Sequence, residues 1–575
     1  MPPQPSSLII GNCSGFYGDR ASAMREVLTG GPVDVLTGDY LAELTMLILY
    51  RARIKDPAKG FATSFLRQLE PLLTTVWERG TKVVVNAGGL APAACAQAVR
   101  DLAAALGLSL DVAHVEGDDL LDKVRELRLQ HLDTGEELPA APPLTANAYL
   151  GGWGIAAALD GGAQVVVTGR VTDASLVLGP AASHFGWGRE DWDRLAGAVV
   201  TGHLLECGTQ VTGGNYSFVQ DEVPNPLRMG FPLAEVFQDG SALITKHPGT
   251  GGAVTVGTVT AQLLYEIAGP RYDGPDVVAD FSTVRLERIG TDLVRVSGAR
   301  GEPPSGRVKV ALTMAGGFRN RMEFVLTGLD IEGKAALALA GLADAYPHPF
   351  DATVVRLDRE DAPTNEQAAA LLRVHVRDSD AKKVGRVFSD AAVQLALASY
   401  PGFTLTSQPT DAQPYGVYWP SLVDAADVEQ VVVHADGRRQ PVPHTPAGPA
   451  PGVAEPELPA PVEGATRKAA LGTVLGARSG DKGGNANIGF WGRTDEAGAW
   501  LQRFMTPARF RELLPEADGL PVEVFRLPNL RAVNVVVVGL LGEGVAASSR
   551  FDPQAKGLGE YLRSRRAHIP VSLLE

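Results

Sequence analysis

The chain has 575 residues, of which 45% are hydrophobic and 21% are charged, so it is a globular protein with room for several domains. Its formal net charge of −14 at pH 7 disfavours polyanionic partners, and we expect no general binding to nucleic acid or to an anionic membrane. The three cysteines, Cys13, Cys95 and Cys207, include no CxxC pair, which excludes a disulfide scaffold and fits a reducing compartment.

The N-terminal segment has neither the basic region nor the long apolar stretch of a secretory signal. The most apolar helical run, 41–50, is interrupted by Glu43 and is too short to cross a bilayer. We therefore expect a cytoplasmic protein. The 65 glycines follow no Gly-X-Y repeat, so turns and loops must hold most of them.

Short apolar runs alternate with helical stretches over roughly the first 215 residues. Strands are expected at 8–10, 33–36, 82–85, 112–115 and 164–167. Helices are expected through Met24 and Val27 and near 41–54, 62–79, 93–106, 120–132 and 145–160. This alternation predicts an α/β fold with a parallel sheet, in which right-handed crossovers gather the loops after the strands at one edge.

The remaining sequence predicts further parts. We expect an α/β domain over 6–270, an α+β extension of the same large region over 271–435, a proline-rich linker over 436–466, and a small α+β domain over 467–575. The linker is indicated by eight prolines between Pro441 and Pro461, a tract that forms neither a helix nor a central strand. The small domain contains a glycine-rich stretch, 476–487, which we expect to be a loop.

Three charged residues at the ends of predicted strands are the candidates for catalysis. Asp39 follows the second strand, and Arg170 and Asp173 follow the fifth. Ligands of open α/β sheets bind at this edge, and a buried aspartate beside an arginine can act as a general acid or base. The alternative is a structural Arg–Asp pair that holds two loops together.

The loop after the first strand is a candidate binding site for an anionic group, because it leads into a helix N-terminus. Its candidate residues are Gly11, Asn12, Ser14, Gly15, Tyr17 and Asp19, and Asn86 and Gly88 follow the third strand. A dinucleotide site is the alternative. Against it, the spacing is GxxxGxxG, Asp19 would lie near the phosphate, and the chain has no YxxxK motif.

Other polar glycine stretches complete the predicted site. The Gly213-Gly214-Asn215 turn offers backbone donors for an oxyanion, and Lys246 begins a basic stretch. In the small domain Arg478, Ser479, Asp481, Lys482 and Asn485 are candidates for holding phosphate or carboxylate, with a tight turn as the alternative.

Two further kinds of chemistry are weighed against simpler interpretations. Cys13 or Cys207 could be a nucleophile activated by a histidine such as His203, but a small buried cysteine explains either residue as well. We expect no metal, because the ten histidines form no ligand motif, although Mg²⁺ held by Asp39, Asp118 or Asp173 stays open.

The motifs GNCSGFYGDR, TGDYLAE, NAGG, TGRVTDASL, ECGTQVTGGNY and GARSGDKGGNANIG resemble the acyclic terpene utilisation (AtuA) family. The resemblance covers about 6–435 and, for an AtuA-like ferredoxin-fold domain, 467–575. It implies a role in citronellol and geraniol breakdown through geranyl-CoA and the carboxylation of isoprenoid acyl-CoA, and it assigns no catalytic residues.

Together these observations predict an enzyme that acts on an acyl-CoA thioester by acid/base chemistry, as a hydratase, isomerase or lyase. The sequence identifies no definite cofactor, and we expect CoA only as part of the substrate. We also expect the protein to form a homo-oligomer. One alternative is a non-catalytic subunit of an acyl-CoA carboxylase, which the linker and the small domain suit. The other is an NAD(P)-dependent dehydrogenase.

Overall fold

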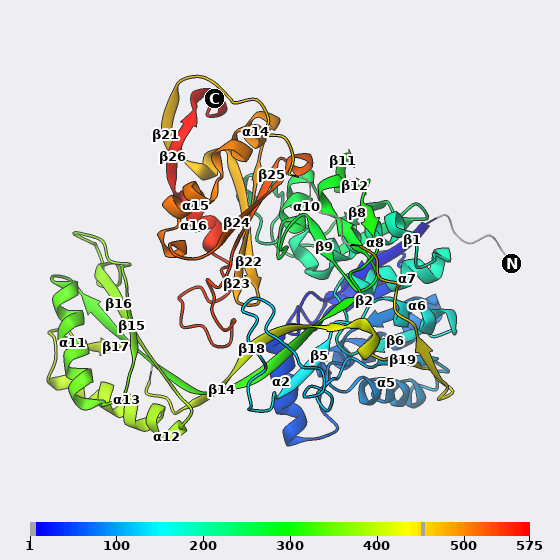
Figure 1. Cartoon of the computed structure of the whole chain (residues 1–575), viewed down its shortest axis with the longest axis horizontal. Helices are drawn as coiled ribbons and strands as arrows, with labels where there is room; N and C mark the ends of the chain where they lie inside the picture. Colours follow the sequence, from blue (N-terminus) through cyan, green and yellow to red (C-terminus); the bar gives the residue numbers. More distant parts are fainter. Residues whose placement is uncertain (1–6, 407, 450–454) are drawn as a thin grey trace. The chain divides into compact units, whose positions relative to one another are not determined.

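The computed structural model describes residues 7–406, 408–449 and 455–575 (Figure 1). Ser6, the expected start of the first domain, and Pro451 of the proline tract lie outside the described residues. The chain divides into two compact units: the first contains the residues up to 313 with 418–545 and 552–575, and the second contains 314–417 with 546–551. This grouping differs from the predicted boundaries, because most of the small C-terminal domain belongs to the first unit.

The first unit is built on an 11-stranded sheet in the order β11-β12-β8-β7-β1-β2-β3-β6-β4-β19-β20. Its central strands are β1 (Ser7–Asn12), β2 (Val35–Gly38), β3 (Lys82–Val85), β6 (Val165–Thr168) and β4 (Val112–Glu116), and all are parallel. The outer strands are antiparallel: β7 (Pro232–Phe237), β8 (Ala242–Lys246), β11 (Arg285–Gly290), β12 (Leu293–Ser297), β19 (Gln430–Val433) and β20 (Arg439–Val442). The predicted α/β fold is confirmed, and antiparallel strands extend its parallel centre on both sides.

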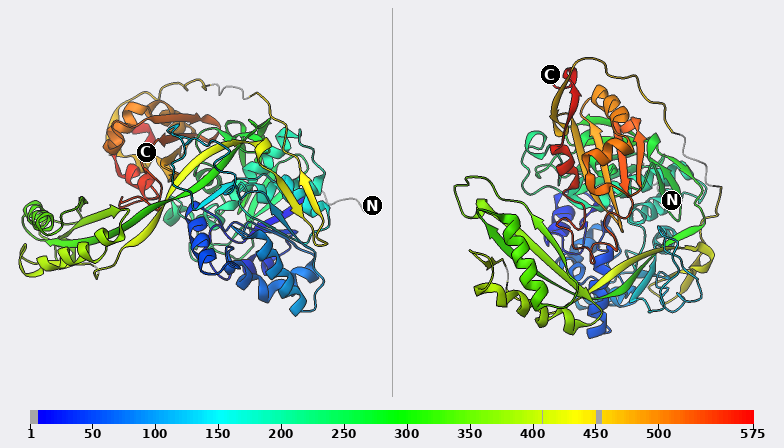
Figure 2. Two further views of the ribbon diagram at one scale, coloured as in Figure 1. Left: turned by 60° about the horizontal axis from the view of Figure 1, so that its bottom comes forward. Right: turned by 60° about the vertical axis from the view of Figure 1, so that its left-hand side comes forward.

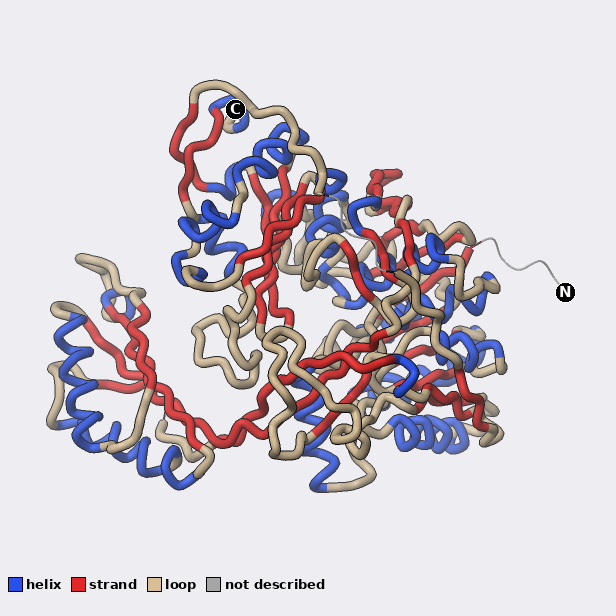
Figure 3. Tube along the Cα trace, in the orientation of Figure 1, coloured by secondary structure: helices blue, strands red, loops and turns tan. Residues whose placement is uncertain are grey.

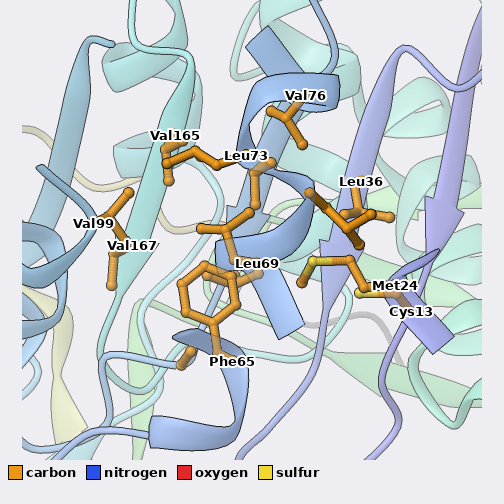
Figure 4. Packing of buried hydrophobic residues seen from close by; sticks show 14 of the residues in the cluster. Cys13, Met24, Leu36, Phe65, Leu69, Leu73, Val76, Val99, Val165 and Val167 are labelled. Carbon is orange, nitrogen blue, oxygen red and sulfur yellow. The ribbon is translucent and has the colours of Figure 1, made fainter. Parts of the chain in front are cut away.

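Helices cover both faces of this sheet, as parallel strands require. One set comprises α1 (Ala23–Gly30), α3 (Thr63–Leu69), α4 (Leu73–Arg79) and α5 (Pro92–Ala105), whose apolar side chains form a core with the strands. Figure 4 shows part of this core, with Leu69 and Leu73 between the strands that carry Val165 and Leu36. The other set comprises α6 (Trp153–Asp160), α7 (Ser175–Phe185) and α8 (Trp192–Glu206). The sheet edge between the two helix layers carries the polar loops.

One predicted helix is wrong, and another begins later than predicted, at Trp153. Residues 120–132 form turns, and the first part of the expected helix at 145–160 is β5 (Thr145–Ala148). β5 pairs antiparallel with the start of β14 (Arg307–Thr327), and the amide of Leu120 donates to the carbonyl of Ala146. Pairing between segments distant in sequence therefore overrides the local helical pattern.

The segment predicted as a linker begins inside the sheet, because β20 pairs with β19 as the last strand at that edge. Pro441 is tolerated there, since an edge strand leaves one row of backbone groups without a partner strand. Residues 443–449 and 455–465 form no helix or strand (Figure 3).

The C-terminal domain has an antiparallel sheet in the order β22-β23-β25-β24, with a separate pair formed by β21 (Thr466–Ala470) and β26 (Arg566–Pro570). Its other elements are β22 (Leu475–Lys482), β23 (Asn485–Gly492), β24 (Val522–Leu527), β25 (Ala532–Val537), α14 (Asp495–Phe504), α15 (Pro507–Leu513) and α16 (Leu558–Ser564). The glycine-rich stretch predicted as a loop is a hairpin. Its glycines admit aromatic rings, since a Cβ at Gly476 would lie 2.2 Å from Trp491 and one at Gly480 would lie 2.5 Å from Tyr265.

The remaining elements of the first unit connect these sheets. They are α2 (Glu43–Lys55), α9 (Val219–Glu222), α10 (Val256–Leu263) and a small antiparallel sheet of β9 (Arg271–Asp273), β10 (Val278–Asp280) and β13 (Arg300–Glu302).

The second unit is a separate α+β layer pair. Its sheet consists of β15 (Asp351–Val355), β16 (Ala369–Asp378), β17 (Thr404–Leu405) and the part of β14 over 314–327. The chain passes between the two units along β14 and β18 (Gln413–Asp424). The helices α11 (Ile331–Ala345), α12 (Ala381–Val384) and α13 (Arg386–Val393) lie on one face of that sheet (Figure 2). Among the described residues, no helix combines the length and apolar character that crossing a membrane requires.

Two glycines with positive φ test how the sheet edge is built. Gly117, after β4, has φ +115°, and a Cβ there would lie 1.7 Å from the carbonyl oxygen of Glu429, whereas Gly107 has φ +70° and open space around it. We expect Gly107→Ala to cost about 1 kcal/mol from backbone strain alone, and Gly117→Ala to cost roughly 3–5 kcal/mol because two backbones must move apart. Urea midpoints recorded by tryptophan fluorescence measure both. Equal losses would contradict the close approach of the two backbones.

Candidate functional site

Asp39 is buried directly after β2, where two neighbouring groups hold its carboxylate. Oδ1 accepts hydrogen bonds from Nδ2 of Asn86 at 2.6 Å and from the amide of Leu41 at 3.2 Å. The side-chain oxygen of Asn86 accepts from the amide of Tyr40 at 2.7 Å. Asn86, which follows β3, therefore fixes the loop that carries Asp39.

Arg170 and Asp173 lie in the loop after β6. Nη1 of Arg170 donates to the carbonyl of Leu41 at 3.0 Å and lies 3.2 Å from Oδ1 of Asp173. The backbone amide of Arg170 donates to Oδ2 of Asp118 at 2.8 Å, and the same oxygen accepts from Nδ2 of Asn147 at 2.9 Å. The loops after β2, β3, β4 and β6 are thus bound to one another at one edge, as the parallel-strand pattern predicts.

A small cavity opens beside Arg170. The guanidinium of Arg170 lies over the ring of Tyr149, 4.1 Å from the ring centroid, and Nζ of Lys309 lies 4.8 Å from the same centroid. Glu43, at the start of α2, accepts a hydrogen bond from the Tyr149 hydroxyl at 3.4 Å. Glu43, Tyr149, Arg170 and Tyr418 line the cavity, whose free volume of about 10 Å³ has room for about one water molecule.

The C-terminal domain contributes two lysines to the same region. Nζ of Lys482, at the end of β22, donates to the backbone carbonyl of Glu266 at 2.8 Å and lies 5.4 Å from the ring centroid of Tyr272. Nζ of Lys556 lies 3.1 Å from Oε1 of Glu266 and 3.4 Å from Oδ1 of Asp481. These groups, with Asp39, Glu43, Arg170, Asp173, Glu206 and Lys309, are here called the charged cluster.

Asn487 and Asn534 attach the C-terminal sheet to this region. Oδ1 of Asn487 accepts from the amide of Glu266 at 2.7 Å, and Nδ2 of Asn534 donates to the carbonyl of Ile267 at 3.2 Å. Both asparagines are fully buried, on the paired strands β23 and β25. The C-terminal domain is therefore docked by specific hydrogen bonds next to the charged cluster.

Burial raises the pKa of several carboxyl groups in the cluster. The pKa of Asp39 is raised well above its usual value by burial and by the charge of Asp173, against the opposing effects of Arg170 and Asn86. Burial also raises the pKa of Asp173 and that of Glu206, and neighbouring carboxylates add to both shifts. These groups hold protons more tightly than ordinary carboxylic acids do.

Glu43 behaves in the opposite way. Burial acts to raise its pKa, but the positive charges of Lys309, Arg170 and Lys482, with a backbone hydrogen bond, outweigh that effect, so the pKa is lowered and the group stays ionised. Burial and the charge of Lys309 lower the pKa of Lys482. The cluster thus holds carboxyl groups whose pKa values are pushed in opposite directions, the usual basis for assigning an acid and a base.

The predicted anion loop after β1 has internal partners. Oδ2 of Asp19 accepts from the amide of Gly15 at 2.9 Å, and Oδ1 accepts from the amide of Arg20 at 2.7 Å. A carboxylate of the chain itself therefore meets donors that a dinucleotide phosphate would need. Nδ2 of Asn12 donates to the carbonyls of Leu205 and Glu206 at 2.6 and 3.2 Å, which ties the loop to the end of α8.

The other residues predicted in these loops are held by packing or by local bonds. The hydroxyl of Ser14 donates to the carbonyl of Phe16, and Tyr17 packs against the core. Gly11 and Gly88 allow close contacts, since a Cβ would lie 2.6 Å from Val27 and 2.4 Å from the carbonyl oxygen of Thr168, respectively.

Several predicted binding residues have partners outside the charged cluster. Nζ of Lys246 lies 2.9 Å from Oδ2 of Asp292. The amides of Gly213 and Gly214 donate to the carbonyls of Gln210 and Thr209, so both are used inside their own turn, where the neighbouring Asn215 has a positive φ. Their roles in substrate binding stay predictions.

The predicted residues of β22 and β23 divide into two groups. Asp481 and Lys482 lie in the charged cluster, and the buried Arg478 donates to Oε1 of Gln210 and lies over the ring of Tyr265. The hydroxyl of Ser479 donates to the carbonyl of Ala555, and Nδ2 of Asn485 donates to Asp133 at 3.2 Å. Arg478 and Lys482 are therefore both paired, and their binding of phosphate stays a prediction.

The cysteines are poorly suited to nucleophilic attack. Burial raises the pKa of Cys13 to about 12 and that of Cys207 well above its usual value, so neither is a thiolate near neutral pH. Burial also lowers the pKa of His203 to about 4.

Among the described residues, no three histidine, cysteine, aspartate or glutamate side chains are grouped to hold a metal ion.

Four residues of the site were not predicted from the sequence: Lys309, Tyr149, Tyr418 and Glu266. Glu43 and Glu206 lie inside the motifs TGDYLAE and ECGTQVTGGNY, which was the available signal for them. Lys309 and Tyr418 lie on β14 and β18, strands outside the parallel sheet, so no strand-end rule could point to them.

The model of the acyclic terpene utilisation family protein AtuA matches residues 8–434, most of the chain. The chain belongs to the acyclic terpene utilisation family. A second model, the AtuA ferredoxin-like domain, matches residues 469–568, and the resemblance seen in the motifs is confirmed in both parts. No curated protein matches the chain. The charged cluster draws Arg170 from the first matched region of this family member and Lys482 from the second.

The role of Asp118 in holding the Arg170 loop can be tested by pH. Burial raises the pKa of Asp118 to about 7, above the usual value of about 4 in an unfolded chain. The folded protein therefore binds the proton of Asp118 more tightly than the unfolded chain does. The contribution of Asp118 to the free energy of unfolding is lost as pH rises from about 4 to about 7, by up to roughly 4 kcal/mol.

We expect the Asp118→Asn variant to lack this loss. Its urea stability should match that of the wild-type protein near pH 4 and should exceed it increasingly up to pH 7. Parallel pH profiles of the two proteins would contradict a buried, proton-holding Asp118.

Proposed function

We propose that this protein is an enzyme that transfers protons on the carbonyl end of a substrate, namely the acyl-CoA thioester of a branched hydrocarbon chain, in a hydratase, isomerase or lyase reaction. The observation that carries the proposal is the position of Arg170, which lies between Asp173 and the cavity shared with Glu43. Membership of the acyclic terpene utilisation family supports a substrate with a branched hydrocarbon chain.

Opposite pKa shifts give the two carboxyl groups beside Arg170 different roles. Glu43 stays ionised and is suited to accept a proton, whereas Asp173, with a raised pKa, is suited to donate one. Asp39 also has a raised pKa and is influenced by both Arg170 and Asp173. A proton removed from the carbon next to the carbonyl, or from the γ carbon of a 2-enoyl thioester such as geranyl-CoA, would pass to a carboxylate. The electron pair of the broken C–H bond would move to the carbonyl oxygen, through the double bond in the second case.

In this proposal the guanidinium of Arg170 stabilises that oxygen. Burial and its carboxylate neighbours hold the group in one position, and a fixed charge at a dry site stabilises a developing oxyanion strongly. Both contacts of the guanidinium with Leu41 and Asp173 use Nη1, and arginine has five N–H donors. The cavity has room for an oxygen atom of about the size of water, such as the oxygen of a carbonyl group, and is far too small for the nucleotide of CoA.

Exchange of hydrogen for deuterium tests the proposal. Purified protein is incubated with geranyl-CoA in D₂O, and mass spectrometry measures deuterium in the acyl chain. We expect exchange by the wild-type protein and at least about 100-fold slower exchange for Asp173→Asn, which loses an acid/base group, and for Arg170→Met, which loses a donor to the oxyanion.

Asp101→Asn is the matched control, because Asp101 is an exposed aspartate on α5. It should exchange at the wild-type rate. The proposal fails if the wild-type protein catalyses no exchange between pH 5 and 9, or if Asp173→Asn exchanges as fast as the control.

A further inference from the structure

A second and larger cavity lies next to the small one, farther along α2. Its volume is about 270 Å³, and its apolar lining consists of Tyr50, Ile54, Pro57, Leu90, Leu121 and Leu144. Thr145 lines both cavities. Helix α2 also borders both, with Glu43 and Met46 on the small cavity and Tyr50 and Ile54 on the larger one. The two spaces therefore adjoin at Thr145.

The larger cavity has an inner and an outer end. Arg53 and Asp119 lie on its outer side, where Nη1 and Oδ2 are 3.8 Å apart and the side chains are 46% and 44% exposed. Thr145, on the inner side, is buried. The lining of the larger cavity therefore changes along its length. A solvated ion pair lies at the outer end, apolar side chains follow, and the charged groups around Arg170 lie beyond the inner end.

We propose that the larger cavity binds the hydrocarbon chain of the substrate, about ten carbon atoms long, while its carbonyl end reaches Arg170. The length of the hydrocarbon chain is estimated from the volume of the cavity. A cavity of roughly 150 Å³ takes up the six carbons of benzene, and the volume of 270 Å³ is close to twice that. The apolar residues of the lining offer contact to a hydrocarbon chain, and Arg53 and Asp119 stay at the solvated outer end. The inference rests on the proposed function for the direction of the substrate.

Binding of simple acids and alcohols tests the pocket in the full-length protein. Calorimetry is used to measure the affinity of unbranched fatty acids from butanoate to tetradecanoate, with decan-1-ol as an uncharged probe. We expect affinity to rise about fourfold per methylene group up to about ten carbons and then to level off.

Two variants probe the lining and one serves as control. Ile54→Glu places a charge at an exposed lining residue and Leu121→Trp fills the space, and each should weaken decanoate binding at least tenfold. Ile48→Glu makes the same change on α2, at a residue that is 39% exposed and does not line the cavity. It should leave the affinity unchanged. Equal affinities of Ile54→Glu and Ile48→Glu would overturn the proposal, as would a lack of dependence on chain length.

The Arg170→Met variant separates this proposal from the proposed function. It should weaken decanoate but not decan-1-ol. If short and long acids bind alike and both depend on Arg170, the pocket is overturned and the proposed function stands. If decan-1-ol binding depends on Ile54 but geranyl-CoA shows no deuterium exchange, the pocket stands and the proposed function fails.

Discussion

The burial of charged groups at the carboxyl edge of the parallel strands is the constraint on which the rest of the site depends. A carboxylate removed from water without a partner is so costly that it either keeps its proton or pairs with a cation. Asp39, Asp173 and Glu206 meet this cost by raised pKa values, and Glu43 meets it by facing Lys309 and Arg170. Burial raises the free energy of these carboxylates, and it also shifts their pKa values to those that proton transfer requires.

This constraint explains why the C-terminal domain is docked against the first domain. Lys482 and Lys556 bring positive charge to a region rich in carboxyl groups, and Asn487 and Asn534 fix the backbone at Glu266 and Ile267. Gly480 leaves the space in which Tyr265 lies against β22. The sequence predicts a separate small domain, yet its contacts make it part of the wall around the charged cluster.

Much of the fold and part of the site could be predicted, because the parallel-strand rule is local and strict. It placed Asp39, Asn86, Asp118 and Arg170 at one edge from the spacing of apolar runs and polar loops alone. It could not find Lys309 or Tyr418, because long-range pairing of β14 and β18 brings them there. Lys246 was predicted from its glycine-rich surroundings, yet it forms an ion pair with Asp292, a partner that no local pattern reveals.

The central claim is that the buried carboxyl groups of the cluster hold their protons to a higher pH than ordinary carboxylic acids do. Infrared difference spectroscopy of the full-length protein at pH 7 tests it most directly, because a protonated carboxyl group has a C=O stretch distinct from that of a carboxylate. The account predicts a protonated-carboxyl band in the wild-type protein that weakens in the Asp39→Asn variant and disappears on raising the pH. A wild-type spectrum without this band, or a band that the substitution leaves unchanged, would contradict it for Asp39.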